Sequence, residues 1–356
     1  MILLEKEERK LDSKSKGVLA LVLALVILAN IGIFYKMHAN KDVSNADVIV
    51  VRIGHTTAEN NPIHEALAQF EKELEESSNG RFDVRIYPNS SLGGDRQEVE
   101  SAILGYIQGC LPPNAILSGF DTRFMVSDLP FVYQSGASAM AALNGELGDE
   151  LNPILDDMGL HSMGWTESGF RYITSNDLPV TSPDDLKGLS IRTMENPIHV
   201  ASFKAWGANP TPMAFSELFT ALQQGAVDAQ ENPIIVSMSS RFFEVQNTLS
   251  LTGHFYSAGT LVFNKDFYES LKGEDKKLFD EASEHCVKNL TEMVWDQNEE
   301  FIQTARDEGM NVVEVTPEQK AVFRDAASNV YQLYIEQYGG SQELIDKAMM
   351  YNDDFE

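Results

Sequence analysis

The chain has 356 residues, 43% of them hydrophobic and 23% charged, which is typical of a folded globular protein long enough for two domains. Its 27 basic and 54 acidic residues give a formal net charge of -27. This charge argues against nucleic acid as a partner, because phosphate backbones are bound by basic faces. Two cysteines, Cys110 and Cys286, are too few for a disulfide scaffold, and we expect both to be unpaired and buried.

An uncharged apolar run, residues 17–35, follows the charged N-terminus, and Lys36 comes directly after it. The run approaches the ~20 residues that cross a bilayer and exceeds the ~7–15 residues of a signal-peptide core. A small-residue site at Ser44 and Ala46 lies well beyond it. We expect residues 1–46 to be a cytoplasmic tail plus a membrane anchor or signal segment, with an uncleaved anchor slightly favoured. The rest of the chain is expected in the periplasm or on the outer face of the cytoplasmic membrane.

Strand-like and helix-like segments alternate along the remaining chain, which is typical of α/β architecture. β-branched or alternating runs predict strands, and apolar residues three and four apart predict helices. Extended or strand-like segments are expected at 46–55, 81–88, 106–117, 124–133, 161–176, 188–194, 208–213, 226–233, 259–264 and 310–317. Helices are expected at 59–80, 93–105, 136–159, 196–207, 214–225, 265–271, 274–308 and 318–340.

The helix expected over residues 274–308 carries the clearest information about architecture. No proline or glycine interrupts it. At 1.5 Å per residue it is ~50 Å long, whereas a small domain is only ~30 Å across. We therefore expect a two-lobed fold in which this helix spans both lobes. Lobe I is expected to hold residues 47–169 and about 258–295, and lobe II residues 170–257 and about 296–356.

Catalytic signatures are missing from the sequence. It contains no Gly-x-Ser-x-Gly, no Walker loop and no Gly-x-Gly-x-x-Gly. The seven histidines show no spacing typical of metal ligands. We therefore expect no enzyme activity, no metal and no cofactor.

Polar residues gather where predicted strands end, which is where ligands bind in open α/β sheets. A cleft lined by two arginines and an amide suits a carboxylate with hydroxyls beside it, because guanidinium matches carboxylate with two parallel hydrogen bonds. The candidates are Arg192, Arg171, Asn232, His55, Asp95 and Asn114.

Each of these candidates also has a structural interpretation. Arg192 could pair with Glu195 at the surface, and Arg171 could pair with a structural acid. Asn232 could shape a turn before the following proline, and Asp95 could act only as a favourable acid at a helix N-terminus.

Residues 185–233, "DLKGLSIRTMENPIHVASFKAWGANPTPMAFSELFTALQQGAVDAQENP", resemble the hallmark of TRAP-transporter solute-binding proteins of the dicarboxylate-binding-protein type. Residues 90–105 and 242–257 are also similar to that family, and the likeness covers about residues 48–340. It implies an extracytoplasmic receptor that closes on an organic acid and delivers it to the membrane permease subunits of a TRAP transporter.

The resemblance also implies roles for particular residues. The family's carboxylate-binding arginine matches Arg192, its second arginine matches Arg171, and its amide matches Asn232. Phe215 and His254 match positions that often line the cleft, although either could be ordinary packing.

The central stretch is most similar to the subgroup that binds sugar acids such as uronates and ketogulonates, so a sugar acid is the expected ligand. A C4-dicarboxylate or another small carboxylate is the first alternative. A ligand-sensing receptor for a signalling partner is the second. An enzyme acting on a sugar acid with His55 or His254 as base is disfavoured, because no acid–base pair is apparent.

Overall fold

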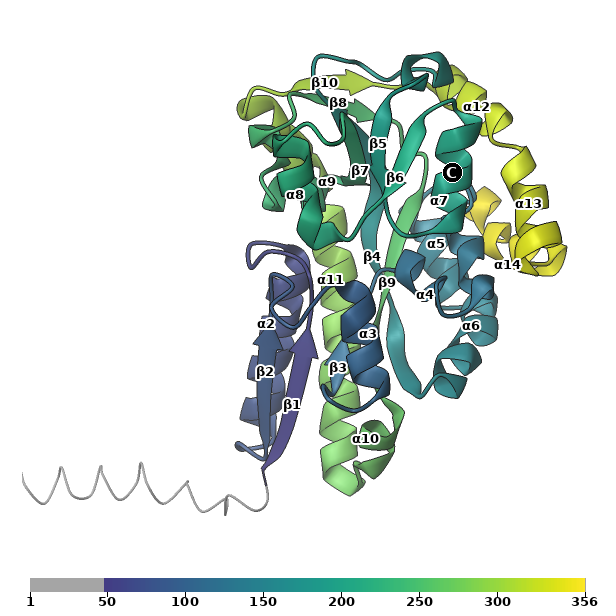
Figure 1. Ribbon diagram of the computed structural model, residues 1–356. Helices are drawn as coiled ribbons and strands as arrows, with labels where there is room; N and C mark the ends of the chain where they lie inside the picture. Colours follow the sequence, from purple (N-terminus) through teal and green to yellow (C-terminus); the bar gives the residue numbers. More distant parts are fainter. Residues whose placement is uncertain (1–47, 356) are drawn as a thin grey trace, which may run out of the picture. The chain divides into compact units, whose positions relative to one another are not determined.

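A ten-stranded mixed sheet organises residues 48–355, the part of the chain that the computed structural model describes (Figure 1). The strands are β1 (Ile49–Gly54), β2 (Phe82–Tyr87), β3 (Gly109–Cys110), β4 (Leu160–Ser175), β5 (Ser190–Thr193), β6 (Asn209–Pro212), β7 (Ala229–Pro233), β8 (Thr248–Leu251), β9 (Tyr256–Asn264) and β10 (Asn311–Glu314). Their order is β2–β1–β3–β9–β4–β7–β5–β6, and β8 pairs with both β4 and β10.

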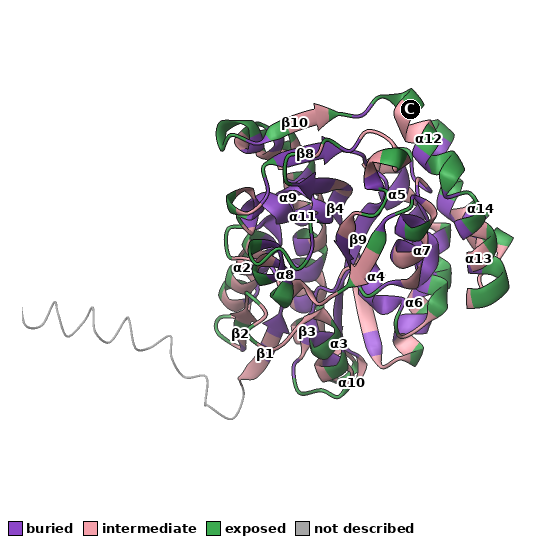
Figure 2. Cartoon of the chain, turned by 45° about the horizontal axis from the view of Figure 1, so that its top comes forward, coloured by how far each residue is buried: buried purple, intermediate pink, exposed green. Residues whose placement is uncertain are grey.

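Helices cover the sheet and connect its strands. They are α2 (Pro62–Ser77), α3 (Asp95–Ile103), α4 (Asn114–Leu117), α5 (Gly136–Leu143), α6 (Glu146–Asp157), α7 (Pro197–Ala205), α8 (Phe215–Gln223), α9 (Ile234–Ser239), α10 (Lys265–Ser270), α11 (Gly273–Asp307), α12 (Pro317–Ala326), α13 (Asn329–Tyr338) and α14 (Gln342–Met349). Short 3₁₀ helices lie at Thr122–Asp128, Pro183–Leu186, Phe242–Glu244 and Asn352–Asp354. Figure 2 shows that the strands are mostly buried, whereas α12 to α14 expose much of their surface.

The predicted tail and apolar run, residues 1–46, lie outside the described residues. Within residues 48–355, no helix combines the length and the apolar character that crossing a membrane requires. Both cysteines are free and buried, as the sequence predicts.

Strand β4 joins two groups of strands. Its first part, from Leu160 to Phe170, pairs antiparallel with β9. Its last part, from Arg171 to Ser175, pairs with β7, and the final residues also pair with β8. The sequence predicts a strand-like piece and a turn here, but the chain forms one 16-residue strand. A register shift between Glu167 and Gly169 makes a bulge just before the strand changes partners.

Helix α11 confirms the prediction of one long unbroken helix. It runs from Gly273 to Asp307, against 274–308 expected from the sequence. Its buried stripe includes Phe279, Cys286 and Leu290. The helix packs against α2 and β4 and continues to α9 and β10, so it contacts elements at both ends of the sheet (Figure 1).

Two segments differ from the prediction. The helix expected over 318–340 is broken into α12 and α13, because Ala327 leaves helical geometry with φ -102° and ψ 10°. The extended run expected at 124–133 begins as a 3₁₀ helix, Thr122–Asp128. The assignment of residues to two lobes remains a prediction. Helix α14 packs against α5 and α6, which the sequence assigns to the other lobe.

Candidate functional site

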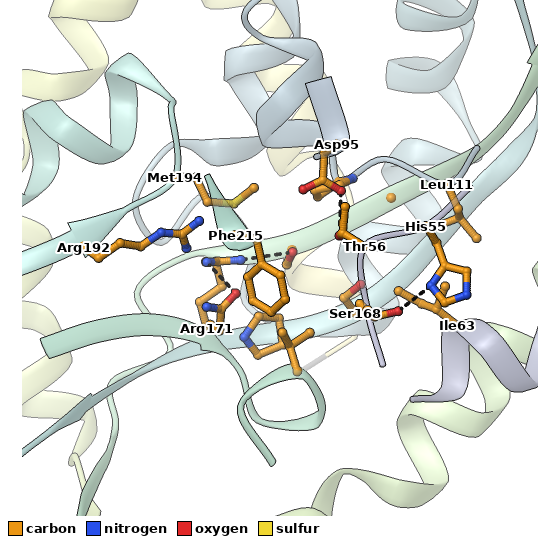
Figure 3. Close-up of a pocket in the computed structure, with 17 residues that line it drawn as sticks. His55, Thr56, Ile63, Asp95, Leu111, Ser168, Arg171, Arg192, Met194 and Phe215 are labelled. Carbon is orange, nitrogen blue, oxygen red and sulfur yellow. Dashed lines mark hydrogen bonds between the residues drawn. The ribbon is translucent and has the colours of Figure 1, made fainter. Parts of the chain in front are cut away.

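A cavity of about 50 Å³ lies where β1, β5 and β7 end, and β4 forms its floor (Figure 3). Six of the eight residues predicted from the sequence line it. They are His55, Asp95, Arg171, Arg192, Phe215 and Asn232. The sequence therefore identifies most of the charged and amide groups that these strand and helix ends bring together.

Arg192 supplies a cation with an unused donor. Its side chain is buried at the end of β5. Nε and Nη2 donate to the carbonyl oxygen of Met213 at 3.1 and 2.8 Å, which fixes the plane of the guanidinium. Nη1 is buried and has no hydrogen-bond partner among residues 48–355. No carboxylate in that range forms an ion pair with Arg192, so the alternative of a surface pair with Glu195 is not observed.

The surroundings of Arg192 favour an anion. Burial, reinforced by Arg171 and partly offset by Glu231 and Asp95, lowers the pKa of Arg192 to about 10. The side chain thus remains a cation at neutral pH. A buried donor without a partner costs about 1–3 kcal/mol, or more when it is charged. An anionic ligand that accepts from Nη1 would remove this cost.

Arg171 lines the same cavity but already has an acid partner. Its Nε and Nη2 lie 2.5 and 2.9 Å from the two carboxylate oxygens of Glu231. Nη2 also donates to Oδ1 of Asn232 at 3.1 Å. Nη1 is the least engaged group, with only Ser257 Oγ at 3.5 Å. Arg171 therefore fits both interpretations. Its ion pair with Glu231 fixes the orientation of the guanidinium, and Nη1 is left to face the cavity.

Glu231 is a functional neighbour that the sequence analysis missed. It is fully buried at the β7 register position opposite Ile173 of β4. Burial alone raises its pKa, but Arg171 and a hydrogen bond from His254 outweigh burial and lower the pKa well below its usual range. A buried glutamate sixty residues from its arginine leaves no pattern in the sequence that would reveal the pairing.

His254 and Asn114 do not line the cavity. The ring of His254 faces Thr252 Oγ1 at 2.7 Å and Glu231 Oε2 at 3.3 Å. Asn114 donates from Nδ2 to Asp128 Oδ2 at 3.0 Å and to a backbone carbonyl oxygen. Both side chains are buried, and their hydrogen bonds go to other residues of the protein, so the structure shows ordinary packing for them.

Another part of the lining is polar and carries the carboxyl group of Asp95, whose pKa is raised by burial, while the Thr56 hydrogen bond and the charge of Arg192 oppose that shift. Asp95, the first residue of α3, accepts a hydrogen bond from Thr56 Oγ1 at 2.9 Å. His55 pairs with Thr57 Oγ1 at 2.9 Å and with His64 Nδ1 at 3.0 Å. Burial, with a smaller effect of His64, lowers the pKa of His55 to about 3, so its ring is neutral at pH 7.

Hydroxyl groups complete the polar lining, and the sequence did not single them out. They belong to Thr56, Thr57, Ser168 and Ser257. Ser168 is the extra residue of the β4 bulge, which turns it toward the cavity beside Arg171. Serine and threonine are too common for their type alone to mark a site. Among the residues described, no cluster of three or more His, Cys, Asp or Glu side chains could hold a metal ion.

Comparison with known proteins identifies the family. The sequence matches the family described as "Bacterial extracellular solute-binding protein, family 7" over residues 53–337. The chain belongs to this family. It is a TRAP solute-binding protein, and this family consists of receptors rather than enzymes.

Two curated relatives illustrate the similarity. A solute-binding protein of Verminephrobacter eiseniae is 37% identical over 289 residues, which are 81% of this chain and 86% of the relative. The 2,3-diketo-L-gulonate-binding periplasmic protein YiaO of Escherichia coli is 33% identical over 279 residues, which are 78% of this chain and 84% of the relative.

Solved structures share the fold. The sugar acid binding protein DctPAm of Advenella mimigardefordensis, in complex with galactonate, has a TM-score of 0.83 at 28% identity and covers 86% of this chain and 99% of its own. A TRAP periplasmic solute-binding protein of Shewanella oneidensis with bound succinate has a TM-score of 0.82 at 27% identity, with coverage of 86% and 99%. These matches confirm the predicted two-lobed, periplasmic-binding-protein-like α/β fold.

Proposed function

We propose that this protein is a receptor for a hydroxylated monocarboxylate of the sugar-acid class. The observation that carries the proposal is the buried Nη1 of Arg192, a cationic donor that lines the cavity without a partner among the described residues. A ligand carboxylate would accept from Nη1 and from the second hydrogen of Nη2, because only one Nη2 hydrogen is directed to Met213. Arg171 Nη1 and Asn232 stand nearby to bind the same carboxylate or the adjacent hydroxyl.

Asp95 would discriminate between a sugar acid and a dicarboxylate. It is an acceptor in the cavity lining, and His55 and Thr56 add neutral polar groups. The hydroxyls of a sugar acid would donate to Asp95. The second carboxylate of a C4-dicarboxylate would face the Asp95 carboxylate instead, and like charges at close range are unfavourable. This charge arrangement favours one carboxylate and a polyhydroxyl tail.

The relatives support both the proposed ligand class and the alternative. YiaO is named for 2,3-diketo-L-gulonate, and DctPAm was solved with galactonate. The Shewanella oneidensis protein holds succinate, so a C4-dicarboxylate remains the competing ligand. We propose in addition that the receptor delivers its acid to TRAP permease subunits. Loss of growth on the acid after deletion of the permease genes would support transport, whereas retained growth with loss of an acid-induced response would favour a sensing receptor.

A thermal-shift panel tests the ligand class. Galactonate, glucuronate, diketogulonate, erythronate and succinate are each titrated against the purified protein. A ligand at 100 times its dissociation constant should raise the unfolding free energy by ~2.7 kcal/mol. We expect at least one polyhydroxyl acid to stabilise the protein more than succinate at equal concentration. Greater stabilisation by succinate would reject the sugar-acid proposal.

Asp95→Asn provides a matched test of the charge argument. The amide keeps the size of the side chain and its acceptor oxygen for Thr56, but removes the negative charge. We expect the variant to bind succinate more tightly relative to galactonate than the wild type does. As a control, Asp121→Asn removes one charge at the N-cap of the 3₁₀ helix Thr122–Asp128, outside the residues that line the cavity, and should leave the ratio unchanged. An unchanged ratio in Asp95→Asn would show that Asp95 does not select the ligand.

The N-terminal segment is proposed to place the receptor outside the cytoplasm. Residues 17–35 would direct export and, if uncleaved, tether the protein to the outer face of the membrane. Cell fractionation followed by N-terminal sequencing decides between the two forms. A soluble extracytoplasmic protein that starts near Asp47 would show a cleaved signal, and a membrane-bound protein that starts at its own N-terminus would show an anchor.

A further inference from the structure

A second cavity, here called the reverse cavity, lies on the other side of β4 from the ligand cavity. It encloses about 470 Å³, within the ~300–1,000 Å³ of small-molecule sites. Strand alternation separates the two cavities: Arg171 lines the ligand cavity, while Phe170 and Tyr172 line the reverse cavity. The other lining residues are Phe131, Tyr133, Gln134, Gly253, Pro317, Lys320 and Arg324.

Aromatic side chains form the apolar walls of the reverse cavity. The rings of Tyr133 and Phe170 pack edge-on against Tyr256, with centroids 5.5 and 5.3 Å apart, so both rings are held in place. Phe131 has a positive φ of 58°, which costs a bulky residue roughly 1–3 kcal/mol. Its backbone N–H donates to the carbonyl oxygen of His254 at 3.0 Å and holds this conformation. Flat apolar surfaces of this kind suit an aromatic ring.

Two cations face the same space. Lys320 and Arg324 lie one helical turn apart on α12, and neither forms an ion pair with any acid in the described part of the chain. Like charges at this spacing are unfavourable for the helix. Burial lowers the pKa of Lys320, and Glu314 opposes that effect from a longer range. In a chain of net charge -27, two neighbouring cations without acid partners mark a site for an anion.

Gly253 lines the reverse cavity beside Lys320 and Tyr172. A Cβ added there would lie 3.4 Å from Lys320 Nζ and 3.9 Å from a ring carbon of Tyr172. The glycine also has a positive φ of 58°, which a side chain would strain. The backbone conformation, rather than a lack of space, therefore requires glycine at this position.

From these features we infer that the reverse cavity is a second binding site, for a small aromatic carboxylate. The carboxylate would lie between Lys320 and Arg324, and the ring would lie among Phe131, Phe170 and Tyr172. This ligand differs from the sugar acid proposed for the ligand cavity, because the reverse cavity offers rings where the ligand cavity offers hydroxyl groups and Asp95.

The two cavities are connected through few contacts. Phe131 donates to the backbone of His254, whose ring lies 3.3 Å from Glu231 Oε2, and Glu231 forms the ion pair with Arg171. A ring that fixes Phe131 would therefore act on the support of Arg171. Any such effect must be reciprocal, since each ligand changes the affinity for the other by the same factor.

Calorimetric titration with benzoate tests the site on the full-length protein. We expect one benzoate per chain, with binding retained in Arg192→Ala and weakened roughly tenfold or more in Lys320→Gln/Arg324→Gln. Lys277→Gln, at an exposed position of α11, is the charge control and should bind as the wild type does. Cyclohexanecarboxylate, which has the charge without the aromatic ring, should bind more weakly. The site is rejected if benzoate does not bind, or if its binding is lost in Arg192→Ala and kept in the double variant.

A second titration tests the connection and rests on the proposed function. Galactonate is titrated with and without saturating benzoate, and we expect its dissociation constant to change. An unchanged constant, with both ligands bound, would overturn the connection through His254. Failure of galactonate to bind at all would count against the proposed function, whereas the benzoate titration stands independently of it.

Discussion

Replacing Arg192 by alanine tests the role of the unpartnered guanidinium. Arg192 is only 2% exposed, and its Nη1 has no partner within residues 48–355, so a ligand carboxylate would form a desolvated charge pair with it. Breaking a pair of this kind costs ~3–5 kcal/mol, or roughly 100- to 5,000-fold in affinity. Folding should be affected less. The Met213 carbonyl oxygen loses its donors at a cost of ~1–3 kcal/mol, but a buried cation without a direct ion pair is removed at the same time.

Arg192→Lys separates charge from geometry. An ammonium keeps the charge but cannot donate in one plane both to Met213 and twice to a carboxylate, so we expect at least about tenfold weaker binding. Calorimetric titration with the best acid of the panel measures both variants. Arg85→Ala, which removes an exposed arginine, serves as the control and should bind normally. Near-normal affinity in Arg192→Ala would remove Arg192 from the site, and near-normal affinity in Arg192→Lys would show that charge alone matters.

Three further predictions follow from the same structure. Arg171→Met leaves Glu231 charged and buried without its partner, so chemical denaturation should show that the free energy of unfolding falls by ~3–5 kcal/mol. Adding Glu231→Gln should restore most of that free energy, and no recovery would refute the ion-pair argument. Burial, followed by the charge of Asp95, raises the pKa of Glu98 from 4.5 to about 9. The folded state therefore holds a proton on Glu98 that the unfolded state releases, so the free energy of unfolding should fall as pH rises from about 4.5 to 9. Chemical denaturation across this pH range should show a flatter dependence on pH in Glu98→Gln, and an unchanged dependence would contradict the raised pKa of Glu98. Residues from both predicted lobes line the ligand cavity, so we predict that the lobes lie further apart in the free protein and close on the ligand. Solution scattering should then show a smaller radius of gyration with ligand, and an unchanged radius would count against closure.

The sequence predicts the parts of the fold whose signals are local. The long helix is visible because no proline or glycine interrupts it, and its observed bounds, Gly273–Asp307, differ from the prediction by one residue at each end. The break between α12 and α13 is not visible, because "DAASN" contains neither proline nor glycine. Residues 161–176 were predicted as one strand-like piece and a turn, and this segment contains Gly164 and Gly169. In the fold these glycines lie at register shifts within one strand.

The candidate site shows the same division between local and long-range information. Arg192 and Asn232 stand at strand ends, so the order of elements is enough to bring them to one cavity. The partner of Arg171 is Glu231, and only the antiparallel pairing of β4 with β7 brings the two together. His254 supports Glu231 instead of lining the cavity, and a sequence shows where a histidine lies but not which way its ring faces.

A crystal structure with the acid that stabilises the protein most in the thermal-shift panel tests the central claim most directly. The account predicts a bound polyhydroxyl acid with its carboxylate within hydrogen-bond distance of Arg192 Nη1, and at least one hydroxyl donating to Asp95. A bound dicarboxylate, or an acid whose carboxylate lies away from Arg192 while a hydroxyl faces the guanidinium, would contradict it.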